Sequence, residues 1–384
     1  MHFNFSQTPM LYFGQGQFTK LADHLKSFGS KALIITSQSF INSENATWLK
    51  NTLNTNKLTA SWEQMHGEPS PEQIDKITAE NRSFAPDVIV AIGGGSVLDA
   101  GKAVSAMLCE KGSISNFLED VGTQTPSGNK IPMIAVPTTA GTGSEATKNA
   151  VITKNGKDGF KKSLRHKHYV PNIAIVDPTL SLSCPPSVTA ASGMDAFTQL
   201  LESYLSTQST PISDALALDG LKMLIGSLEK AVANGDDIEA RSKLSYAAFL
   251  SGITLANAGL GVVHGFAQPL GSLFPIPHGV VCALLTGSAN RMSVEKLRTE
   301  NKHTSLKKYA IVGRLIQPTS NDKTAIEVLL NYIERLTTNF HIPKLSAYGV
   351  RKADFTAIVK QTGLKNHPVK LNKEELTQIL YNCL

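Results

Sequence analysis

Short apolar runs that alternate with helical stretches are the feature that most restricts the fold of this chain. Nearly continuous runs of valine, isoleucine and other apolar residues lie at 31–36, 86–92, 131–136 and 173–177. Parallel strands that are covered on both faces have such sequences. Helical patterns at 71–81 and 97–107 lie between these runs. The alternation predicts an α/β domain with a doubly wound parallel sheet in the first part of the chain.

The pattern changes beyond the last of these runs, where strand-like segments give way to long helical ones. Pro185 and Pro186 introduce helical patterns at 188–205, 211–233, 238–258 and 323–338. A chain of 384 residues is long enough for two domains. We therefore predict an α/β domain over 1–180 and an all-α domain over 181–384. The polar stretch 298–308 is expected to be an exposed connection or a frayed helix.

Composition and charge argue against several classes of function. The net charge of +6 is spread along the chain and aromatic residues make up only 7%, which disfavours a nucleic-acid groove. The densest basic cluster, at 161–168, is expected to be a solvated loop, unless part of it meets an anionic cofactor. No apolar run reaches the roughly 20 residues of a membrane span, and the N-terminus does not resemble a secretory signal. We expect a cytoplasmic protein that binds neither nucleic acid nor membrane.

The cysteines form no recognisable framework. The chain has four, which are Cys109, Cys184, Cys282 and Cys383, and they lack Cys-x-x-Cys spacing. This pattern favours neither a set of disulfides nor a cysteine zinc site. We expect reduced and mostly buried thiols.

Two loops of small residues follow predicted strands and form a candidate nucleotide site. The first, Gly-Gly-Gly-Ser at 93–96, lies between the strand at 86–92 and a helix. Glycine there allows a diphosphate to approach backbone N–H groups, and a helix N-terminus adds favourable partial charge. The second loop, at 137–145, carries the hydroxyl groups of Thr138, Thr139, Thr142 and Ser144. The first loop alone fits a tight turn equally well, but two loops at the ends of parallel strands favour a nucleotide.

An aspartate and two histidines form a candidate metal site. Asp195 follows Gly-Met, His264 precedes a glycine, and His278 stands between proline and glycine. Neutral imidazoles with one carboxylate suit a divalent cation and leave a coordination position for a substrate oxygen. Gln199 and Gln268 lie four residues after Asp195 and His264, so each shares a helix face with its partner. From composition alone, ordinary histidines explain the pattern equally well.

Together these motifs resemble those of the iron-dependent (group III) alcohol dehydrogenases, which belong to the dehydroquinate synthase-like superfamily. The segment 93–102 is similar to the family's GGGSxxDxxK loop, and 139–145 matches its TAGTGSE signature. The later matches, in order along the chain, are 171–178, 189–195, His264 and 277–279. The resemblance covers nearly the whole chain.

The resemblance implies a dinucleotide domain, a helical metal-binding domain, and hydride transfer between NAD or NADP and a small alcohol or aldehyde. It also implies a homodimer. Asp195, His264 and His278 would bind one divalent metal, which polarises the substrate oxygen. The residues that would bind the cofactor are Gly94, Gly95, Ser96, Asp99, Thr138, Thr139, Thr142, Ser144, Lys162 and, on the adenosine side, Leu180.

Two glutamines depart from the family pattern at the metal site. Gln199 stands where a ligand histidine is usual, and its amide oxygen is only a weak candidate for a further ligand. Gln268 stands where another histidine is usual, which removes a titratable group near the chemistry. An aspartate with two histidines suits Zn²⁺ at least as well as Fe²⁺, because Zn²⁺ ranks higher in intrinsic affinity. Both ions remain open.

A third departure concerns the cofactor. NAD-preferring relatives often carry an acidic residue just beyond the first strand, where it accepts a hydrogen bond from the ribose 2′-hydroxyl. Here Ser37, Gln38 and Ser39 follow the strand. Because no carboxylate repels a 2′-phosphate, we expect NADP(H) to be accepted, with Ser37 beside the ribose.

Two other functions remain open. The chain could be another enzyme of the superfamily, such as a polyol dehydrogenase, a maleylacetate-type reductase or a lyase. The lyases need basic residues in the cleft, and none lies close in sequence to Asp195 or His264, whose neighbours Phe197 and Phe266 fit an apolar pocket or a core. Alternatively, the glutamines indicate a nucleotide-binding protein with a decayed metal site.

Overall fold

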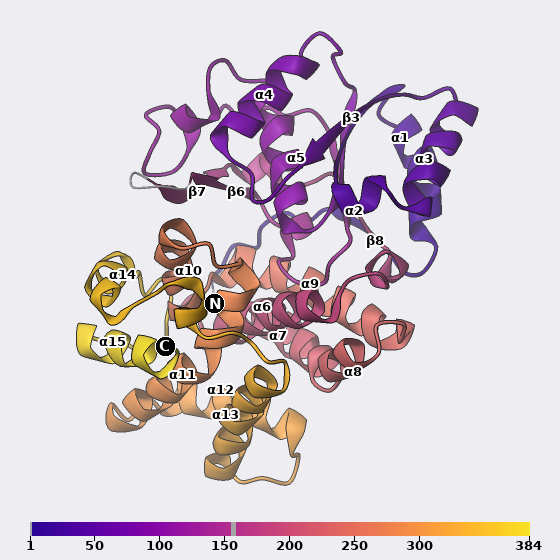
Figure 1. Cartoon of the computed structure of the whole chain (residues 1–384). Helices are drawn as coiled ribbons and strands as arrows, with labels where there is room; N and C mark the ends of the chain where they lie inside the picture. Colours follow the sequence, from indigo (N-terminus) through magenta and orange to yellow (C-terminus); the bar gives the residue numbers. More distant parts are fainter. Residues whose placement is uncertain (1, 155–158) are drawn as a thin grey trace. The chain divides into compact units, whose positions relative to one another are not determined.

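The computed structural model describes residues 2–154 and 159–384, which divide into two compact units. The α/β unit runs from Ser6 to Cys184. The helical unit runs from Pro185 to Leu384 and includes the first residues of the chain up to Phe5. Figure 1 shows a sheet flanked by helices in the first unit and packed helices in the second. The predicted fold class, a parallel α/β domain followed by an all-α domain, is confirmed.

In the described part of the α/β unit, six strands form one parallel sheet in the order β1-β8-β5-β4-β2-β3. They are β1 (Met10–Phe13), β2 (Lys31–Ser37), β3 (Thr59–Met65), β4 (Val88–Gly93), β5 (Met133–Pro137) and β8 (Ile173–Val176). The predicted strands correspond to β2, β4, β5 and β8. The edge strands β1 and β3 were not predicted, because a strand with partly exposed side chains lacks a continuous apolar run.

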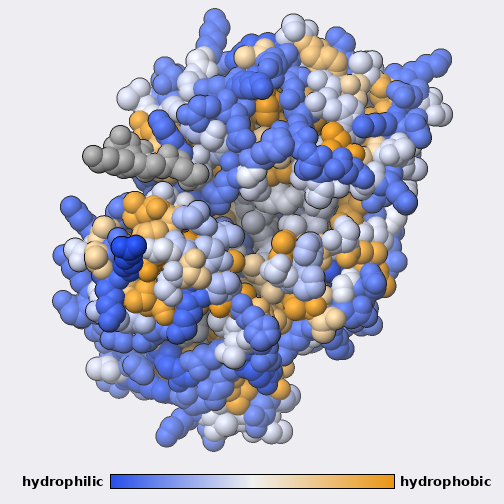
Figure 2. Space-filling view, in the orientation of Figure 1, coloured by the Kyte–Doolittle hydropathy of each residue, from blue (hydrophilic) through white to orange (hydrophobic). Residues whose placement is uncertain are grey.

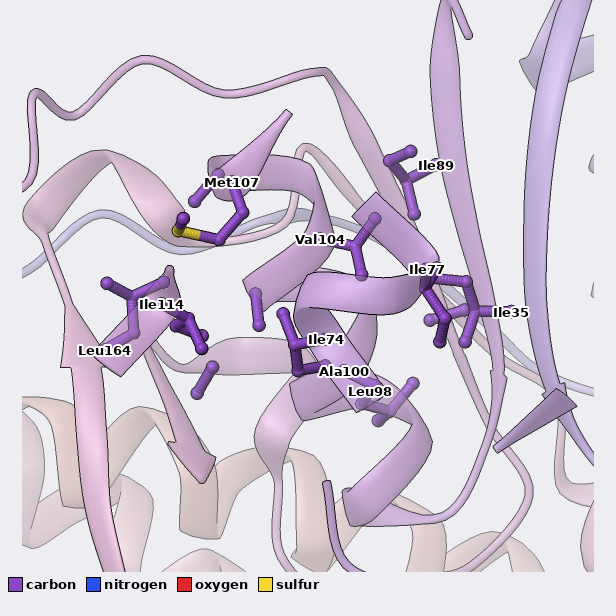
Figure 3. Close-up of a cluster of buried hydrophobic side chains, with 14 of the residues drawn as sticks. Ile35, Ile74, Ile77, Ile89, Leu98, Ala100, Val104, Met107, Ile114 and Leu164 are labelled. Carbon is purple, nitrogen blue, oxygen red and sulfur yellow. The ribbon is translucent and has the colours of Figure 1, made fainter. Parts of the chain in front are cut away.

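Alternate residues of the central strands build a core on each face of the sheet. On one face, Ile35 and Ile89 pack among residues of α4 (Pro71–Asn81) and α5 (Gly95–Met107). Figure 3 shows Ile77 of α4 beside Ile35 in this cluster. On the other face the sheet packs against α1 (Leu21–Lys26) and α3 (Glu44–Thr55), through residues such as Ile34, Val90, Leu25 and Leu49. The sheet is therefore doubly wound, as predicted.

The basic cluster predicted as a loop is mostly a strand. β7 (Phe160–Arg165) pairs antiparallel with β6 (Asn149–Lys154), and the short 3-10 helix Lys167–Tyr169 follows. Ion pairs hold two of the lysines: Lys161 Nζ lies 2.6 Å from Glu68 Oε1, and Lys162 Nζ lies 2.8 Å from Asp120 Oδ2. The polar side chains of β7 hid its extended conformation in the sequence.

The described part of the helical unit contains no strand. Its helices are α6 (Pro186–Leu205), α7 (Pro211–Leu224), α8 (Ser227–Ala233), α9 (Ile238–Ala258), α10 (Val262–Leu273), α11 (His278–Thr299), α12 (His303–Ile316), α13 (Asp322–Asn339), α14 (Phe355–Gln361) and α15 (Lys373–Asn382). One expectation was wrong: the predicted helix 211–233 is broken at Gly226, whose φ of 74° ends one helix and begins another. The polar stretch 298–308 contains the end of α11, an exposed connection at 300–302 and the first turns of α12, which agrees with the expected exposed connection.

The surface is mostly hydrophilic on the face shown in Figure 2. Among the described residues, the large hydrophobic side chains that are exposed come from separate segments, for example Val121, Val188 and Leu273. No single helix in the described chain is long and apolar enough to cross a membrane; α9 and α10 pass that test only as a pair, bent by 100°.

Candidate functional site

The order of strands identifies the edge of the sheet where a nucleotide is expected. From β2 the chain moves to β3 on one side and then returns to β4 on the other side. Ligands of doubly wound folds bind at the carboxyl ends of strands where the order reverses in this way. Thr36 of β2 lies opposite Ile92 of β4, so the loops that begin at Ser37 and Gly94 leave the sheet at the same edge.

The first glycine-rich loop is as compact as a phosphate cradle requires. Gly94 is the N-cap residue of α5, and no side chain caps that helix. A Cβ atom on Gly95 would lie 2.6 Å from Thr142 Cγ2, and one on Gly94 would lie 3.3 Å from Thr139 Oγ1. The two predicted loops therefore pack against each other, with space for backbone but little for side chains. This arrangement fits a nucleotide diphosphate.

The small residues of the cradle are partly exposed to solvent. Strands β4 and β5 are fully buried, whereas the residues that follow them are partly exposed. Those partly exposed residues are Gly94, Gly95, Ser96, Thr138, Thr139 and Thr142. Thr138 also donates its backbone N–H to Gly93 O at 3.0 Å, which ties the second loop to the first.

Asp99 and Ser144, both predicted to bind cofactor, are bonded to each other. Ser144 Oγ donates to Asp99 Oδ1 at 2.5 Å, and Val151 N donates to Asp99 Oδ2 at 3.0 Å. Lys102 Nζ lies 3.0 Å from Asp99 Oδ1 and donates to Ser144 O. Burial lowers the pKa of Lys102, although Asp99 opposes that effect, and burial raises the pKa of neighbouring Glu145 to about 7. This buried network holds the second loop against α5.

The other predicted cofactor residues lie in separate parts of the unit. Ser37 is the N-cap of the short helix α2 (Gln38–Ile41) and accepts the N–H of Phe40. Gln38 is hydrogen-bonded to Gln64 of β3. Leu180 is buried in the core cluster that covers one face of the sheet. Lys162 is part of β7, paired with Asp120 as described above.

The predicted metal ligands meet in the helical unit. Asp195 comes from α6, His264 from α10 and His278 from the first turn of α11. Asp195 Oδ1 lies 3.2 Å from His264 Nε2 and 3.6 Å from His278 Nε2. Asp195 and His264 are buried, whereas 29% of the His278 side chain is exposed. The structure thus brings together residues 83 positions apart, from Asp195 to His278, and leaves one side of the cluster accessible.

Close packing of α6 against α11 positions Asp195 and His278. A Cβ atom on Gly279 would lie 2.6 Å from Ala191 O, so glycine allows α11 to approach the backbone of α6. Thr198 Oγ1 and Thr286 Oγ1 form a 2.6 Å hydrogen bond between the same two helices. The contact fixes His278 beside Asp195, which lies between Ala191 and Thr198 on α6.

Glu202, which sequence reasoning missed, orients His264. Glu202 lies seven residues after Asp195 and so shares its helix face. Its Oε2 lies 2.7 Å from His264 Nδ1, and its Oε1 accepts the N–H of Val263 at 2.7 Å. A carboxylate that accepts from Nδ1 leaves the lone pair of Nε2 directed at the cluster, which is the usual outer-shell arrangement of a metal-bound histidine.

The side chain of Gln199 is hydrogen-bonded next to Asp195. Its Oε1 accepts a hydrogen bond from Ser251 Oγ at 3.0 Å, and its side chain is also hydrogen-bonded to Asp195. Gln199 therefore contacts the carboxylate of Asp195. Gln268 is partly exposed on α10. Phe197 and Phe266 are fully buried, so they belong to the core and do not line an open pocket.

Cys282 also reaches the cluster. Its Sγ lies 3.7 Å from His264 Nε2 and 3.8 Å from His278 Nε2. One donor atom from each of Asp195, His264, His278 and Cys282 lies within 4.8 Å of all the others. Of the thiols expected to be mostly buried, Cys282 and Cys383 are buried, Cys184 is half-buried and Cys109 is exposed. The sequence signal for Cys282 is its position four residues after His278, which the Cys-x-x-Cys criterion does not include.

The electrostatics of the cluster keep Asp195 ionised beside the two imidazoles. Burial disfavours the charged form of Asp195, but His278, His264 and Gln199 outweigh it and hold the pKa of Asp195 at about 2. Burial also disfavours a charged His264, yet contacts with Cys282, Asp195 and Glu202 raise its pKa well above the usual value. Burial raises the pKa of the Cys282 thiol to about 12. Nitrogen, oxygen and sulfur donors of this kind fit Zn²⁺ or Fe²⁺.

A doubly wound parallel sheet followed by a helical unit with a mostly buried Asp–His–His cluster is an arrangement expected of a nucleotide-dependent oxidoreductase. Comparison with known proteins agrees. The sequence profile of the iron-containing alcohol dehydrogenases matches residues 8–178, and that of the family's C-terminal domain matches 189–384. The chain therefore belongs to the iron-containing alcohol dehydrogenase family. The prediction of an NAD(P)-dependent oxidoreductase that acts on alcohols or aldehydes is confirmed at this level.

Individual relatives match over most of their length. The NAD-dependent methanol dehydrogenase of Bacillus methanolicus is 29% identical over 99% of this chain and 100% of its own. The NADPH-dependent butanol dehydrogenase of Clostridium saccharobutylicum is 32% identical over 84% of this chain and 82% of its own. The solved structure of an alcohol dehydrogenase from Oenococcus oeni has a TM-score of 0.87 and 30% identity, and the match covers 100% of both chains.

Proposed function

We propose that this protein uses a divalent metal held by Asp195, His264 and His278 to reduce small aldehydes, or to oxidise the matching alcohols, with NADPH as an accepted cofactor. The observation that carries the proposal is the convergence of the carboxylate and both imidazoles, at 3.2 and 3.6 Å, in one mostly buried cluster. In a decayed site, nothing would maintain three donor atoms in positions that converge on one point.

The roles of the surrounding residues follow from their contacts. When bound, the metal would polarise the substrate oxygen and favour the alkoxide. Glu202 holds the Nδ1 proton of His264, so that Nε2 faces the metal position. Gln199 supports Asp195. The exposed part of His278 marks the side from which a substrate can approach.

The nucleotide is proposed to bind at the edge where β2, β4 and β5 end. Its diphosphate would lie on Gly94, Gly95 and the N-terminus of α5, where backbone N–H groups are directed at the ligand. Uncharged Ser37 beside the ribose supports acceptance of NADP(H), and NAD(H) is the alternative. The proposed division of labour follows the predicted domains, with nucleotide on 1–180 and metal with substrate on 181–384. A cytoplasmic homodimer is proposed on the resemblance to the family.

The test follows nicotinamide oxidation with a panel of small aldehydes. Protein stripped of metal is refilled with Fe²⁺, with Zn²⁺ or with nothing, and each sample is assayed with NADPH and with NADH. We expect turnover only after a metal is restored. Turnover that is equal with and without metal contradicts the metal role, and equal or better catalytic efficiency with NADH contradicts a preference for NADPH.

A further inference from the structure

We infer that the thiolate of Cys282 is a fourth protein ligand of the metal and supplies the donor that Gln199 does not. The inference deepens the proposed function and rests on it for the identity of the Asp195–His264–His278 site. Nothing in the family resemblance suggests it, because the resemblance leads to a nitrogen donor at position 199.

The distances between the donor atoms fit a tetrahedral metal site. Zinc bonds of about 2.1 Å to nitrogen or oxygen and about 2.3 Å to sulfur give tetrahedral edges of about 3.4 Å for N–O pairs and about 3.6 Å for N–S pairs. The two N–O pairs here measure 3.2 and 3.6 Å. The two N–S pairs, from Cys282 Sγ to His264 and to His278, measure 3.7 and 3.8 Å. The remaining N–N and O–S pairs lie within 4.8 Å, so an ion can enter once the side chains draw in around it.

The position of Cys282 on α11 directs it at the site. It lies one turn after His278, so both side chains share one face of the helix. Cys282 is fully buried, and the sulfur contacts both ligand imidazoles. Cys383, which is also buried, donates its thiol to Leu284 O at 3.4 Å instead. Burial alone therefore does not explain the placement of Cys282 among the ligands.

Gln199 is held in a supporting position. Its carboxamide is hydrogen-bonded both to Ser251 and to Asp195. A glutamine so bonded steadies the carboxylate of Asp195. Its Oε1 already accepts from Ser251, whereas the sulfur of Cys282 contacts both imidazoles of the cluster.

A sulfur ligand changes the chemistry of the site. Binding forms a metal–sulfur bond and breaks the S–H bond, and the proton leaves to solvent. Asp195 and Cys282 together then carry two negative charges, which balance a divalent ion. Thiolate ligands favour Zn²⁺ over the harder ions, so the set Asp–His–His–Cys favours zinc in a family that is described by its iron.

Cobalt spectroscopy tests the inference directly. The full-length protein is stripped of metal and titrated with Co²⁺ alone, and metal content is measured in parallel. We expect a sulfur-to-cobalt charge-transfer band in the near ultraviolet, growing to one equivalent. The band should vanish in Cys282→Ser and persist in Cys383→Ser, the matched buried control. We also expect Zn²⁺ to bind about 100-fold more weakly to Cys282→Ser, at the upper end of the loss seen for outer-shell changes.

A rescue variant separates ligand loss from misfolding. The double variant Cys282→Ser with Gln199→His restores a fourth donor one turn after Asp195, and should regain affinity for Zn²⁺ without regaining the sulfur band. The unaltered protein alone already decides the matter: stoichiometric Co²⁺ without a sulfur band overturns the inference, and so does failure to bind Co²⁺.

Spectroscopy and turnover also distinguish the two proposals. Metal-dependent turnover without a sulfur band leaves the proposed function standing and removes Cys282 as a ligand. A sulfur band without turnover of any aldehyde keeps Cys282 as a ligand and removes the proposed function.

Discussion

The two candidate binding regions recognise their ligands by opposite means. The nucleotide cradle presents backbone, and its residues are small because Gly95 and Thr142 leave no room for larger ones. The candidate metal cluster presents side chains, each from a different turn of helix, and neighbouring side chains support some of them, as Glu202 supports His264. The cradle should therefore respond to added volume, whereas the cluster should respond to lost donor atoms.

The largest effect is expected from His264→Ala. The variant removes a metal donor, and we expect catalytic efficiency to fall about 10³-fold or more, corresponding to about 4 kcal/mol of lost stabilisation by the metal. Binding of NADPH, measured by its fluorescence, should be nearly unchanged, because the cradle belongs to the other unit. The exposed His303→Ala serves as control.

Removal of His264 also leaves Glu202 buried without its histidine partner, which is destabilising. His264→Gln keeps a donor for Glu202, and thermal unfolding of both variants separates instability from lost chemistry. If either folded variant retains full metal-dependent turnover, the metal role of His264 is wrong.

Acid should weaken the helical unit through His367. Burial lowers the pKa of His367 to about 4 from 6.5, and its Nε2 lies 2.8 Å from Ser293 Oγ. The unfolded chain binds a proton more readily, so stability is lost as the pH falls from 6.5 to 4. Relative to His367→Gln, we expect the wild type to lose about 3 kcal/mol of unfolding free energy over this window. Equal pH slopes in denaturant titrations would exclude this role.

The α/β unit should show the opposite dependence through Glu145. Burial raises the pKa of Glu145 from 4.5 to about 7, so the folded protein binds the proton more readily than the unfolded chain. The stability that this proton contributes is present below pH 4.5 and is lost as the pH rises to 7. Relative to Glu145→Gln, we expect the wild type to lose about 3 kcal/mol over that window. A wild type that instead gains stability with rising pH would show that Glu145 is ionised in the fold.

A single methyl group should impair the cradle. Gly95→Ala places a Cβ atom 2.6 Å from Thr142 Cγ2, and Thr142 is not free to turn away because its Oγ1 accepts the N–H of Ser144. Overpacking of this kind costs about 1–3 kcal/mol, so the Kd for NADPH should rise about 10- to 100-fold.

The double variant Gly95→Ala with Thr142→Ala should recover part of the affinity, since it removes the two closest atoms. Gly363→Ala is the control, because a Cβ atom there meets nothing within 4 Å. An unchanged Kd in Gly95→Ala would mean that the diphosphate does not lie on this loop.

The smallest effect is expected at the ribose end. Ser37→Asp keeps an N-cap residue for α2, since aspartate caps as well as serine, but adds a charge that repels a 2′-phosphate. We expect the ratio of catalytic efficiencies, NADPH over NADH, to fall about tenfold, or about 1.4 kcal/mol. Ser43→Asp makes the same exchange at the N-cap of α3 and should leave the ratio unchanged. Equal shifts in both variants would point to a general effect of charge.

The contrast also explains what the sequence could and could not predict. The candidate cradle could be located from the sequence because its strand, glycines and helix lie in one segment. Strands β1 and β3 were missed because their side chains are partly exposed and lack a continuous apolar run. The antiparallel pair of β6 and β7 was missed because the polar residues of β7 resemble a loop.

At the metal cluster, the ligand motifs were recognisable one by one, but their supporting residues were not. Glu202 and Ser251 are ordinary helical residues until α6, α9 and α10 pack together. The role of Cys282 depends on how α11 packs against α6 and α10. Cysteine spacing alone predicts only cysteine partners, so it could not indicate a histidine from another helix.

The two contacts of Glu202 connect His264 to the first turn of α10. A single carboxylate receives both the imidazole of His264 and the main-chain N–H of Val263, in the first turn of α10. Occupancy of the metal site and fraying of that helix end are therefore thermodynamically linked, and whatever steadies one must steady the other. The exchange rate of one amide hydrogen, that of Val263, would then report how fully the protein is loaded, without any assay of turnover.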